Sequence, residues 1–515
     1  MKKQLNWAVG GMAAIAVLLA FPVLHIVLVI GNLITHLVVL GLQLATSRLP
    51  SVLPLRRSPE REPFISIQVP AYNEPPELLR ETLVALDRLQ WDHYEVLVID
   101  NNTKDEAVWR PVEQLCRQLG PHFRFFHVDP LPGAKAGALN HAWQFMDPRA
   151  EFVFVVDADY VVEPDALRRA AAYLTADDIA LVQFPQDYRN IGRGNTGLAL
   201  DFKHFFAGYM NMANHLGCVP STGTLSLIRV SALRAVGGFD TTVVTEDAEI
   251  GFRLNVAGYR SLYANEVIGR GLMPHDLESL KKQRWRWAFG NAQILRLNWR
   301  KLLFSRRLRW RQKLGYLIHL TAWFNFNLIP CLSLIIVGIL GFSQKMHMLH
   351  PYIAIVSWFT LATFTVLRFG TLFYSLRQAG HRHREIWLAY FTHLGLGWIC
   401  MASWLKCVFT PEAPFIRTNK FLSRHAPSFP RAALVEILLG TALLAACLML
   451  IHSRFTFSPV LAMVMGLAQF FVLWVNHQVR HTLGITHRLQ AAVAEPGAGE
   501  PLVATPADLP PGKLF

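Results

Sequence analysis

The sequence predicts a doubly wound α/β domain joined to an α-helical membrane domain. Between residues 60 and 295, apolar runs of strand length alternate with amphipathic stretches of helical length, which is the pattern of a parallel sheet covered by helices. Long apolar segments lie on both sides of this region. Hydrophobic residues make up 52% of the 515 residues and charged residues 17%, against about 25% charged residues in an average soluble protein. A disordered or fibrous chain is therefore excluded.

The chain is also basic, with 50 Lys and Arg residues against 36 Asp and Glu residues and a formal charge of +14. Such an excess fits a nucleic acid, a membrane surface or an anionic substrate as partner. The 6 cysteines form no Cys-x-x-Cys pair, which argues against a disulfide framework and against a zinc site. We expect reduced thiols that face the cytosol or lie in the membrane.

Residues 1–58 are predicted to form a transmembrane hairpin. The chain is apolar almost without interruption from residue 8 to residue 46, and one straight helix of that length would be about twice as long as the ~30 Å hydrocarbon core. Two spans fit better, with a break near residues 22–25 or 31–32. Basic residues flank the segment on both sides and place both ends in the cytoplasm, namely Lys2, Lys3, Arg48, Arg56 and Arg57.

Residues 59–295 are predicted to form the α/β domain. Strands are expected at residues 64–69, 95–99 and 152–156, and helices at 76–90, 107–119 and 247–257. Asp100 ends the second of these strands and Asp157 ends the third. Ligands of doubly wound sheets bind beyond the carboxyl ends of the strands, so both carboxylates are candidates for a functional site.

A basic segment is predicted to lie on the membrane surface at residues 296–320. From residue 296 to residue 313 it interleaves Arg and Lys with Leu and Trp and contains no acidic residue. This pattern, directly before a span, favours a helix on an anionic leaflet. A nucleic-acid contact is the alternative.

The membrane domain is predicted for residues 321–480, with spans at 321–342, 353–376, 432–451 and 457–478. The apolar stretch 387–409 has basic, cytoplasmic flanks on both sides, so we expect it to lie at the interface without crossing. Residues 481–515 are expected to form a cytoplasmic tail, disordered from about residue 491, where prolines accumulate. The prediction is a multi-pass protein of the inner (plasma) membrane with its α/β domain in the cytoplasm.

Two acidic motifs carry candidate chemistry. Asp157 and Asp159 stand two residues apart at a strand end, where they are suited to hold a divalent cation that bridges a diphosphate. A strand-ending turn explains the same pair. Asp247, in the run Thr245-Glu246-Asp247, is suited to act as a general base, although a helix start with Thr245 as its cap explains this run equally well.

A third motif is aromatic and basic: residues 283–287 read Gln-Arg-Trp-Arg-Trp. An indole ring can stack on a sugar and an arginine can neutralise a diphosphate, whereas tryptophans at a membrane interface are the alternative. Lys135 opens a small-residue turn at 135–138 that is suited to approach a phosphate.

The order of these motifs resembles the processive family 2 glycosyltransferases with a GT-A fold, such as cellulose, chitin, hyaluronan and bacterial β-glucan synthases. The matching segments are Pro-Ala-Tyr-Asn-Glu at 70–74, the strand-end Asp100, Lys-Ala-Gly-Ala-Leu-Asn at 135–140, Asp-Ala-Asp at 157–159, Ser-Thr-Gly-Thr at 221–224, Thr-Glu-Asp at 245–247 and Gln-Arg-Trp-Arg-Trp at 283–287. The membrane layout is similar in outline.

For the donor, the resemblance implies a nucleotide pocket and a metal. Tyr72 and Glu74 would line the nucleotide pocket, and Asp100 would hold the uracil or the ribose. Asp157 and Asp159 would bind the diphosphate through Mg²⁺ or Mn²⁺, with Asp159 the more direct ligand.

For the acceptor, the resemblance implies Asp247 as the general base, Trp287 as the cradle of the acceptor terminus and Arg286 as a contact of the diphosphate. Residues 411–421 are similar to a gating loop. The remaining substrate contacts that we expect are Lys135, Thr245, Glu246, Gln283, Thr418 and Lys420.

One departure from the cellulose synthases concerns the segment after Asp100. Those enzymes usually have a second Asp there, whereas this chain has Asn101-Asn102-Thr103. In this respect the chain looks more like bacterial β-1,3- or β-1,3/1,6-glucan synthases. UDP-glucose is the expected donor.

We therefore expect an inverting, metal-dependent β-glycosyltransferase that elongates a polysaccharide and passes it through its own spans. Inverting transfer needs one base and a stabilised leaving group, whereas a retaining hydrolase needs two carboxylates about 5 Å apart. Two alternatives stay open: an enzyme that adds a single sugar to a lipid or an oligosaccharide, and a membrane transporter whose soluble domain binds a nucleotide. The expected partners are a nucleotide sugar, the growing polysaccharide and the lipid bilayer, and not a nucleic acid.

Overall fold

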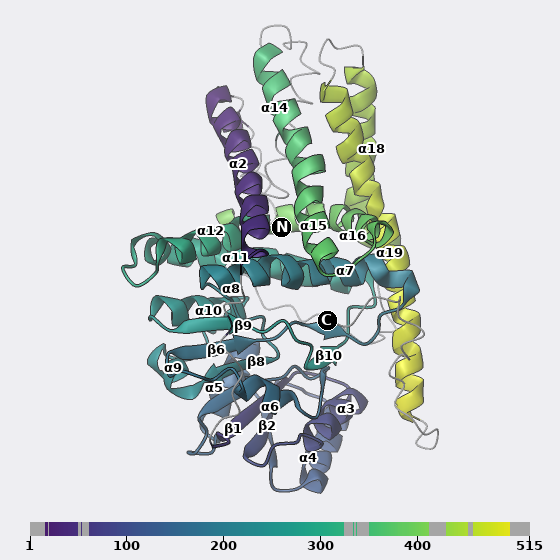
Figure 1. Cartoon of the computed structure of the whole chain (residues 1–515). Helices are drawn as coiled ribbons and strands as arrows, with labels where there is room; N and C mark the ends of the chain where they lie inside the picture. The colour runs from purple at the N-terminus through teal and green to yellow at the C-terminus, as the bar shows by residue number, and fades with distance from the viewer. Residues whose placement is uncertain are drawn as a thin grey trace.

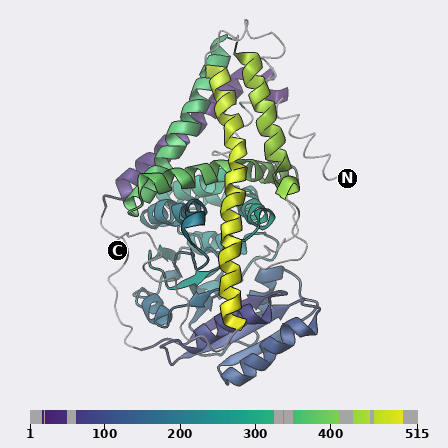
Figure 2. The same cartoon turned by 90° about the vertical axis from the view of Figure 1, so that its right-hand side faces the viewer.

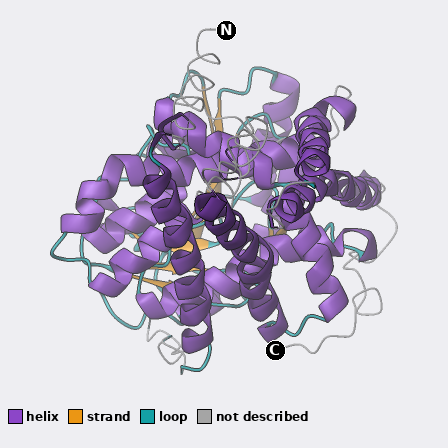
Figure 3. Cartoon of the chain, turned by 90° about the horizontal axis from the view of Figure 1, so that it is seen from above, coloured by secondary structure: helices purple, strands orange, loops and turns teal. Residues whose placement is uncertain are grey.

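An α/β domain and a set of long helices make up the protein (Figure 1). The computed structural model describes residues 16–18, 20–49, 53, 61–323, 333, 336, 350–410, 429–451 and 457–494. Shorter helices lie crosswise between the two parts, so that in a view along the long helices the strands lie beneath a helical layer (Figure 3).

The α/β domain is built on a seven-stranded sheet. Its strands are β1 (Ile65–Ala71), β2 (Tyr94–Asn101), β3 (Phe123–Val128), β4 (Phe152–Val155), β6 (Ile179–Gln183), β8 (Ser226–Arg229) and β9 (Arg260–Tyr263). The strand order is β3-β2-β1-β4-β8-β6-β9. The predicted α/β class is confirmed. The sheet is mixed, because β8 runs antiparallel to β4 and β6 whereas the other pairs are parallel.

Helices cover both faces of this sheet. They are α3 (Pro76–Asp87), α4 (Glu106–Leu119), α5 (Ala134–Ala142), α6 (Ala166–Ala171), α9 (Val230–Ala235) and α10 (Glu246–Val256). All eight residues of β2 are buried, as expected for a strand covered on both faces. The helices predicted at 76–90, 107–119 and 247–257 match α3, α4 and α10, with ends that differ by up to three residues.

A second, three-stranded sheet brings three distant segments together. It has the order β5-β10-β7, from β5 (Val161–Val162), β10 (Gly269–Gly271) and β7 (Asp187–Tyr188). β5 follows the Asp157–Asp159 motif and β10 precedes the helix that carries residues 283–287. The small sheet therefore fixes the acidic motif relative to the aromatic one.

The layer between the two parts contains α7 (Thr196–His204), the π-helix η2 (Phe205–Met210), α8 (Asn211–Leu216), α11 (Leu277–Phe304) and α12 (Trp310–Trp323). The single helix expected at 296–320 is wrong: α11 ends at Phe304, and α12 starts only at Trp310. The Ser305 hydroxyl accepts from the backbone N–H of Arg307 and Leu308 at 3.3 and 3.4 Å, and such bonds compete with helix continuation. Phe304 and Trp310 are 72% and 68% exposed, so the segment does present apolar rings among its basic residues.

Five described helical stretches are long and apolar enough to cross a membrane: Pro22–Thr46, Ala354–Gln378, His383–Phe409, Arg431–Leu448 and Pro459–Leu489. They belong to α2 (Pro22–Thr46), to α14 (His350–Ala362), η5 (Thr363–Leu367) and α15 (Arg368–Gln378), to α16 (His383–Gly395) and α17 (Gly397–Phe409), to α18 (Phe429–Leu450) and to α19 (Phe457–Ala494). The break expected near residues 22–25 falls at the start of α2, and residues 31–32 lie inside it. Residues 1–15, most of the span expected at 321–342 and the loop 411–421 lie outside the described residues.

Helix α2 is polar inside and apolar outside. Its buried residues include His25, Asn32 and His36, whereas Val23 and Val27 are 73% and 59% exposed. Both ring nitrogens of His25 have hydrogen-bond partners, Tyr352 Oη at 2.6 Å and Ser333 Oγ at 2.9 Å. A helix of this kind suits an apolar solvent around the bundle.

Helices α16 and α17 support the expectation that residues 387–409 do not cross. The chain breaks at Leu396 between them, α16 packs on α7, and α17 packs on α11. In Figure 2, α16 runs across the direction of the long helices. By length and composition the same stretch also qualifies as a span, so this expectation stays a prediction.

Helix α19 is much longer than the span predicted at 457–478. It continues to Ala494 and runs from the long helices down beside the α/β domain (Figure 2). The tail predicted from residue 481 is therefore wrong for 481–494, which are helical, because residues 478, 482 and 486 dock on the domain. Residues 495–515 lie outside the described part of the chain.

Candidate active site

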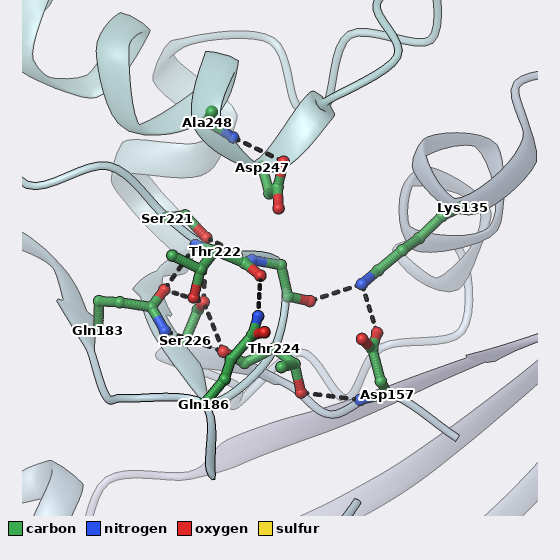
Figure 4. Close-up of polar contacts among 11 residues, drawn as sticks. Lys135, Asp157, Gln183, Gln186, Ser221, Thr222, Thr224, Ser226, Asp247 and Ala248 are labelled. Atoms are coloured by element: carbon green, nitrogen blue, oxygen red, sulfur yellow. Dashed lines mark hydrogen bonds and ion pairs between the residues drawn. The ribbon is translucent and has the colours of Figure 1, made fainter. Parts of the chain in front are cut away.

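Four segments converge where β4 ends (Figure 4). Asp157 follows β4, Lys135 lies in the first turn of α5, Gly223 lies in the loop before β8, and Asp247 lies in the first turn of α10. The Lys135 ammonium group donates to Asp157 Oδ1 and, at 2.6 Å, to the carbonyl oxygen of Gly223. One cation thus ties together segments that are far apart in the sequence.

The loop at 221–224 is held in place from below. The backbone N–H of Thr222 donates to Gln183 Oε1 at 2.9 Å, and Gln186 Nε2 donates to the carbonyl of Thr222 at 2.6 Å. Thr224 Oγ1 accepts from the backbone N–H of Asp157 at 3.0 Å. These bonds fix the loop relative to the acidic motif (Figure 4).

Gly223 brings the backbone very close to Asp247. Its φ is +83°, and a Cβ atom built there would lie 2.6 Å from Asp247 Oδ2 and 3.3 Å from Lys135 Nζ. Only glycine fits such an approach without displacing a neighbour.

The Thr245-Glu246-Asp247 run does begin a helix, as one interpretation of the sequence predicts. Thr245 occupies the N-cap position of α10, yet none of the described residues donates a capping hydrogen bond to its side chain. Asp247 Oδ1 accepts from the backbone N–H of Ala248 at 2.8 Å, and its other oxygen faces Gly223. The helix start therefore leaves Asp247 available for chemistry.

The charges of this site adjust one another. Burial raises the pKa of Asp247, although Lys135 and Arg286 act in the opposite direction. Burial and the neighbouring Asp247 raise the pKa of Glu246 to about 7. Burial alone would lower the pKa of Lys135, but Asp157, Glu246 and Asp247 outweigh it and raise that pKa. The site thus holds a charged lysine beside carboxylates that accept protons more readily than usual.

Asp157 and Asp159 have different surroundings. The Asp157 side chain is 31% exposed and faces Lys135, whereas Asp159 is 5% exposed and its Oδ2 accepts from the backbone N–H of Leu272 at 2.9 Å. Carboxylate and carbonyl oxygens are the ligands that Mg²⁺ and Mn²⁺ prefer, so the residues present fit such an ion. Within the described residues, no group of three or more His, Cys, Asp or Glu side chains forms a complete metal site. A diphosphate would have to supply further ligands.

Asp100 organises the loop after β2. It is 2% exposed, and its oxygens accept from Thr103 Oγ1 at 2.8 Å and from His127 Nδ1 at 2.9 Å. Thr103 Oγ1 in turn accepts from the backbone N–H of Asn73 at 2.7 Å, which lies next to Tyr72, 44% exposed. Sequence reasoning missed Thr103 and His127. His127 was open to prediction, because it lies opposite Asp100 at the end of β3.

The aromatic motif lies on α11 and contains a buried charge. Arg284 is 5% exposed and pairs with Asp201 of α7, whose other oxygen bonds His393 Nδ1 of α16 at 2.8 Å. The guanidinium carbon of Arg284 lies 4.4 Å from the ring centre of Phe202 and 5.0 Å from that of Trp287. Asp201 and His393 carry no sequence signal, since they stand 83 and 192 residues from their partners. Together these contacts hold Trp287 between the domain and the helices.

A cavity of about 200 Å³ starts at this site. Thr245, Asp247 and Trp287 line one part of it, and His36 of α2 and Thr371 of α15 line another. The cavity therefore leads from the carboxylate of Asp247 to the long helices. Gln283 is buried next to it in α11, and Thr418 and Lys420 lie outside the described residues.

A mixed α/β sheet with two acidic motifs, a lysine and an arginine at the strand ends, next to a tryptophan and a cavity, defines the class of nucleotide-sugar glycosyltransferases. The family model "Glycosyltransferase like family 2" matches residues 62–290, and the family model "Cellulose synthase" matches residues 234–392. The chain belongs to the family 2 glycosyltransferases.

Curated relatives agree with this assignment. The chain is similar to a catalytic cellulose synthase protein of Dictyostelium discoideum, at 32% identity over 43% of this chain and 22% of that protein. It is also similar to a probable glucomannan 4-beta-mannosyltransferase of Arabidopsis thaliana, at 29% identity over 48% of this chain and 47% of that protein, and to a catalytic cellulose synthase protein of Pseudomonas fluorescens, at 29% identity over 51% and 35%. The similarity spans less than half the length of these relatives.

A solved structure shows the same fold. It is a mannosyltransferase from Pyrobaculum calidifontis in complex with GDP-Man and Mn²⁺, with a TM-score of 0.52 and 19% identity over 76% of this chain and 99% of that chain. The expectation of a GT-A fold is confirmed by this similarity.

Proposed function

We propose that the protein is a membrane-embedded, inverting and processive β-glycosyltransferase that elongates a polysaccharide from a UDP-sugar. The observation that carries the proposal is the cavity that joins Asp247 and Trp287 to α2 and α15. A soluble, single-transfer enzyme has no need for a path from its base to long apolar helices. Such a path suits a product that leaves through the chain's own spans.

On the donor side, we assign Asp157 and Asp159 to a divalent cation, Mg²⁺ or Mn²⁺. When bound, such an ion neutralises the diphosphate and stabilises the leaving nucleotide. Lys135, already held against Asp157, and Arg286, whose charge acts on Asp247 and Glu246, add positive charge on the same side. Excess charge at the diphosphate is thus shared between side chains and the ion.

On the acceptor side, Asp247 acts as the general base. Its carboxylate takes the proton of the acceptor hydroxyl, the hydroxyl oxygen forms the new bond to the anomeric carbon, and the bond from that carbon to the diphosphate breaks. The nucleoside diphosphate leaves with the electron pair from the opposite face of the sugar. The raised pKa of Asp247 makes it a stronger base than an exposed carboxylate.

For the nucleotide, we assign Tyr72, Glu74 and the loop held by Asp100. Both oxygens of Asp100 are engaged by Thr103 and His127, so we propose that Asp100 shapes this pocket through them. Its direct contact with the uracil or the ribose, which the resemblance implies, stays a prediction.

UDP-glucose is the donor that we propose, with a β-1,3-linked β-glucan as product. The run Asn101-Asn102-Thr103 supports this choice, and Asn102 makes a reciprocal pair with the backbone of Leu131, at 2.7 and 2.8 Å. GDP-mannose is the rival donor, since a mannosyltransferase of the same fold was solved with GDP-Man. We further propose that Gln283 and Trp287 hold the acceptor, that Thr418 and Lys420 gate the donor, and that the α/β domain faces the cytoplasm.

The experiment is to offer the purified protein, in detergent or vesicles, a panel of UDP- and GDP-sugars with Mg²⁺ or Mn²⁺. Product length is read by gel filtration and linkage by specific glycanases, with Asp247→Asn as the inactive control. A long β-glucan from UDP-glucose supports the proposal. A product extended by one sugar would overturn processivity, and full function of Asp247→Asn would favour the transporter alternative.

A further inference from the structure

The lower half of α19 carries a polar stripe that no motif of the sequence predicted. Gln478, Thr482 and Thr486 follow one another at four-residue spacing, so they share one face of the helix. Their exposed fractions are 0%, 0% and 1%. Polar side chains this deeply buried need partners.

Each residue of the stripe has a partner in the segment 190–198, between β7 and α7. Gln478 Oε1 accepts from the backbone N–H of Leu198 at 2.8 Å. Thr482 Oγ1 accepts from Asn195 Nδ2 at 2.7 Å, and Thr486 Oγ1 accepts from Asn190 Nδ2 at 3.1 Å. The stripe thus contacts the segment at three successive points.

Glycines in this segment let α19 approach. A Cβ atom at Gly192 would lie 2.9 Å from Ile485 Cδ1, and one at Gly197 would lie 2.7 Å from Gln478 Oε1. Any larger residue there would push the helix away. The contact is therefore a fitted seam, formed by backbone on one side and by the stripe on the other.

Asn190 connects this seam to the donor side of the site. It is fully buried, its Oδ1 accepts from the backbone N–H of Met273 at 2.9 Å, and its Nδ2 donates to the carbonyl of Met273 at 3.0 Å. The preceding residue, Leu272, donates its backbone N–H to Asp159 Oδ2 at 2.9 Å. Asn190 and Asp159 thus hold adjacent residues of one strand end.

We propose that Asn190 is a positioning residue for Asp159, and that the Gln478–Thr482–Thr486 stripe of α19 keeps Asn190 in place. The inference rests on the proposed function, because it gives Asp159 its meaning as a donor-site carboxylate. Partners behind a metal-binding carboxylate fix its orientation. A membrane helix would then contribute to donor binding without touching the donor.

The test compares Thr486→Val, the double variant Thr482→Val/Thr486→Val and Asn190→Ala with a matched control, Thr441→Val. The Thr441 hydroxyl is exposed and bonds its own helix, at the carbonyl of Ile437. Two readouts are taken on the full chain: amide hydrogen exchange at residues 189–198 and 271–274, and Mn²⁺-dependent binding of UDP by calorimetry.

We expect faster exchange in both segments for every stripe variant. Asn190→Ala should weaken Mn²⁺-dependent UDP binding by about 10- to 100-fold, the range for residues behind a metal ligand, and the valine variants should do so to a smaller extent. UDP binding without Mn²⁺ and all properties of Thr441→Val should stay unchanged. Should Asn190→Ala not fold, Thr486→Val, which removes a single hydroxyl, decides the question.

Faster exchange at 189–198 with unchanged Mn²⁺-dependent binding would overturn the inference, because the stripe would then only dock the helix. A wild-type protein that binds no UDP in the presence of Mn²⁺ would instead contradict the proposed function itself.

Discussion

Replacement of Gly223 by alanine tests the geometry of the candidate base. The new Cβ atom would lie 2.6 Å from Asp247 Oδ2, so the carboxylate has to withdraw by about 0.8 Å to reach ordinary contact, and a misplacement near 1 Å costs about 100-fold in rate. We expect kcat to fall by about 100-fold in a radiolabelled sugar-transfer assay. Nucleotide binding should change little, because the displaced atom lies on the acceptor side.

The chain offers a matched control in Gly237→Ala. Gly237 has φ +79°, close to the +83° of Gly223, but a Cβ atom there meets nothing within 4 Å. Both variants should lose about 1–2 kcal/mol of stability from the left-handed backbone, measured by thermal unfolding. Equal activity of the two variants would refute the assignment of Asp247, since only Gly223→Ala moves it.

Three further predictions concern charge. Because the base must be ionised and the pKa of Asp247 is raised, activity should be lost as pH falls through a value above the ~3.9 of a free Asp, and Glu246→Gln should shift this acid limb of kcat/KM to lower pH by removing a neighbouring negative charge; a limb that stays in place would contradict the coupling. Asp201→Asn leaves its buried arginine partner unpaired and should cost about 3–5 kcal/mol in thermal unfolding, whereas Asp178→Asn, in an exposed pair, should cost under about 1 kcal/mol; similar losses would argue against a buried pair. Chelation of divalent metal should abolish transfer, and Asp159→Ala should raise the metal concentration that half-restores it; an unchanged metal requirement would remove Asp159 from the metal site.

The elements that position the site were predictable from the sequence because local patterns determine them. Continuous apolar runs predicted β1, β2 and β4, and the residues at their ends, Asp100 and Asp157, lie at the edge of the sheet as expected. The helix start at Thr245 was predicted as well. What the pattern left open was whether Asp247 is used by the cap, and the backbone approach of Gly223 shows that it faces the site.

The contacts between distant segments were not predictable in this way. The pair of Arg284 with Asp201 joins α11 to α7, and no periodicity connects residues on different helices. The antiparallel β8 follows from a loop rather than from a local signal. The length of α19 was missed because hydropathy falls where Gln478 and Thr482 begin, although these residues continue the helix by docking on the α/β domain.

Helix α2 has a consequence for how substitutions are judged. In a soluble protein a side chain that touches nothing, such as Val23 or Val27, can be exchanged for a charged one at little cost. Here these side chains are the exposed ones, and in a bilayer an Arg or Lys near the middle of the helix costs about 2.5–3.5 kcal/mol. The rule is reversed on the inner side, where His25 and His36 occupy positions that a soluble helix gives to leucine. Exposure in this half of the protein therefore measures contact with lipid, and conservative design there means apolar residues outside and polar residues inside.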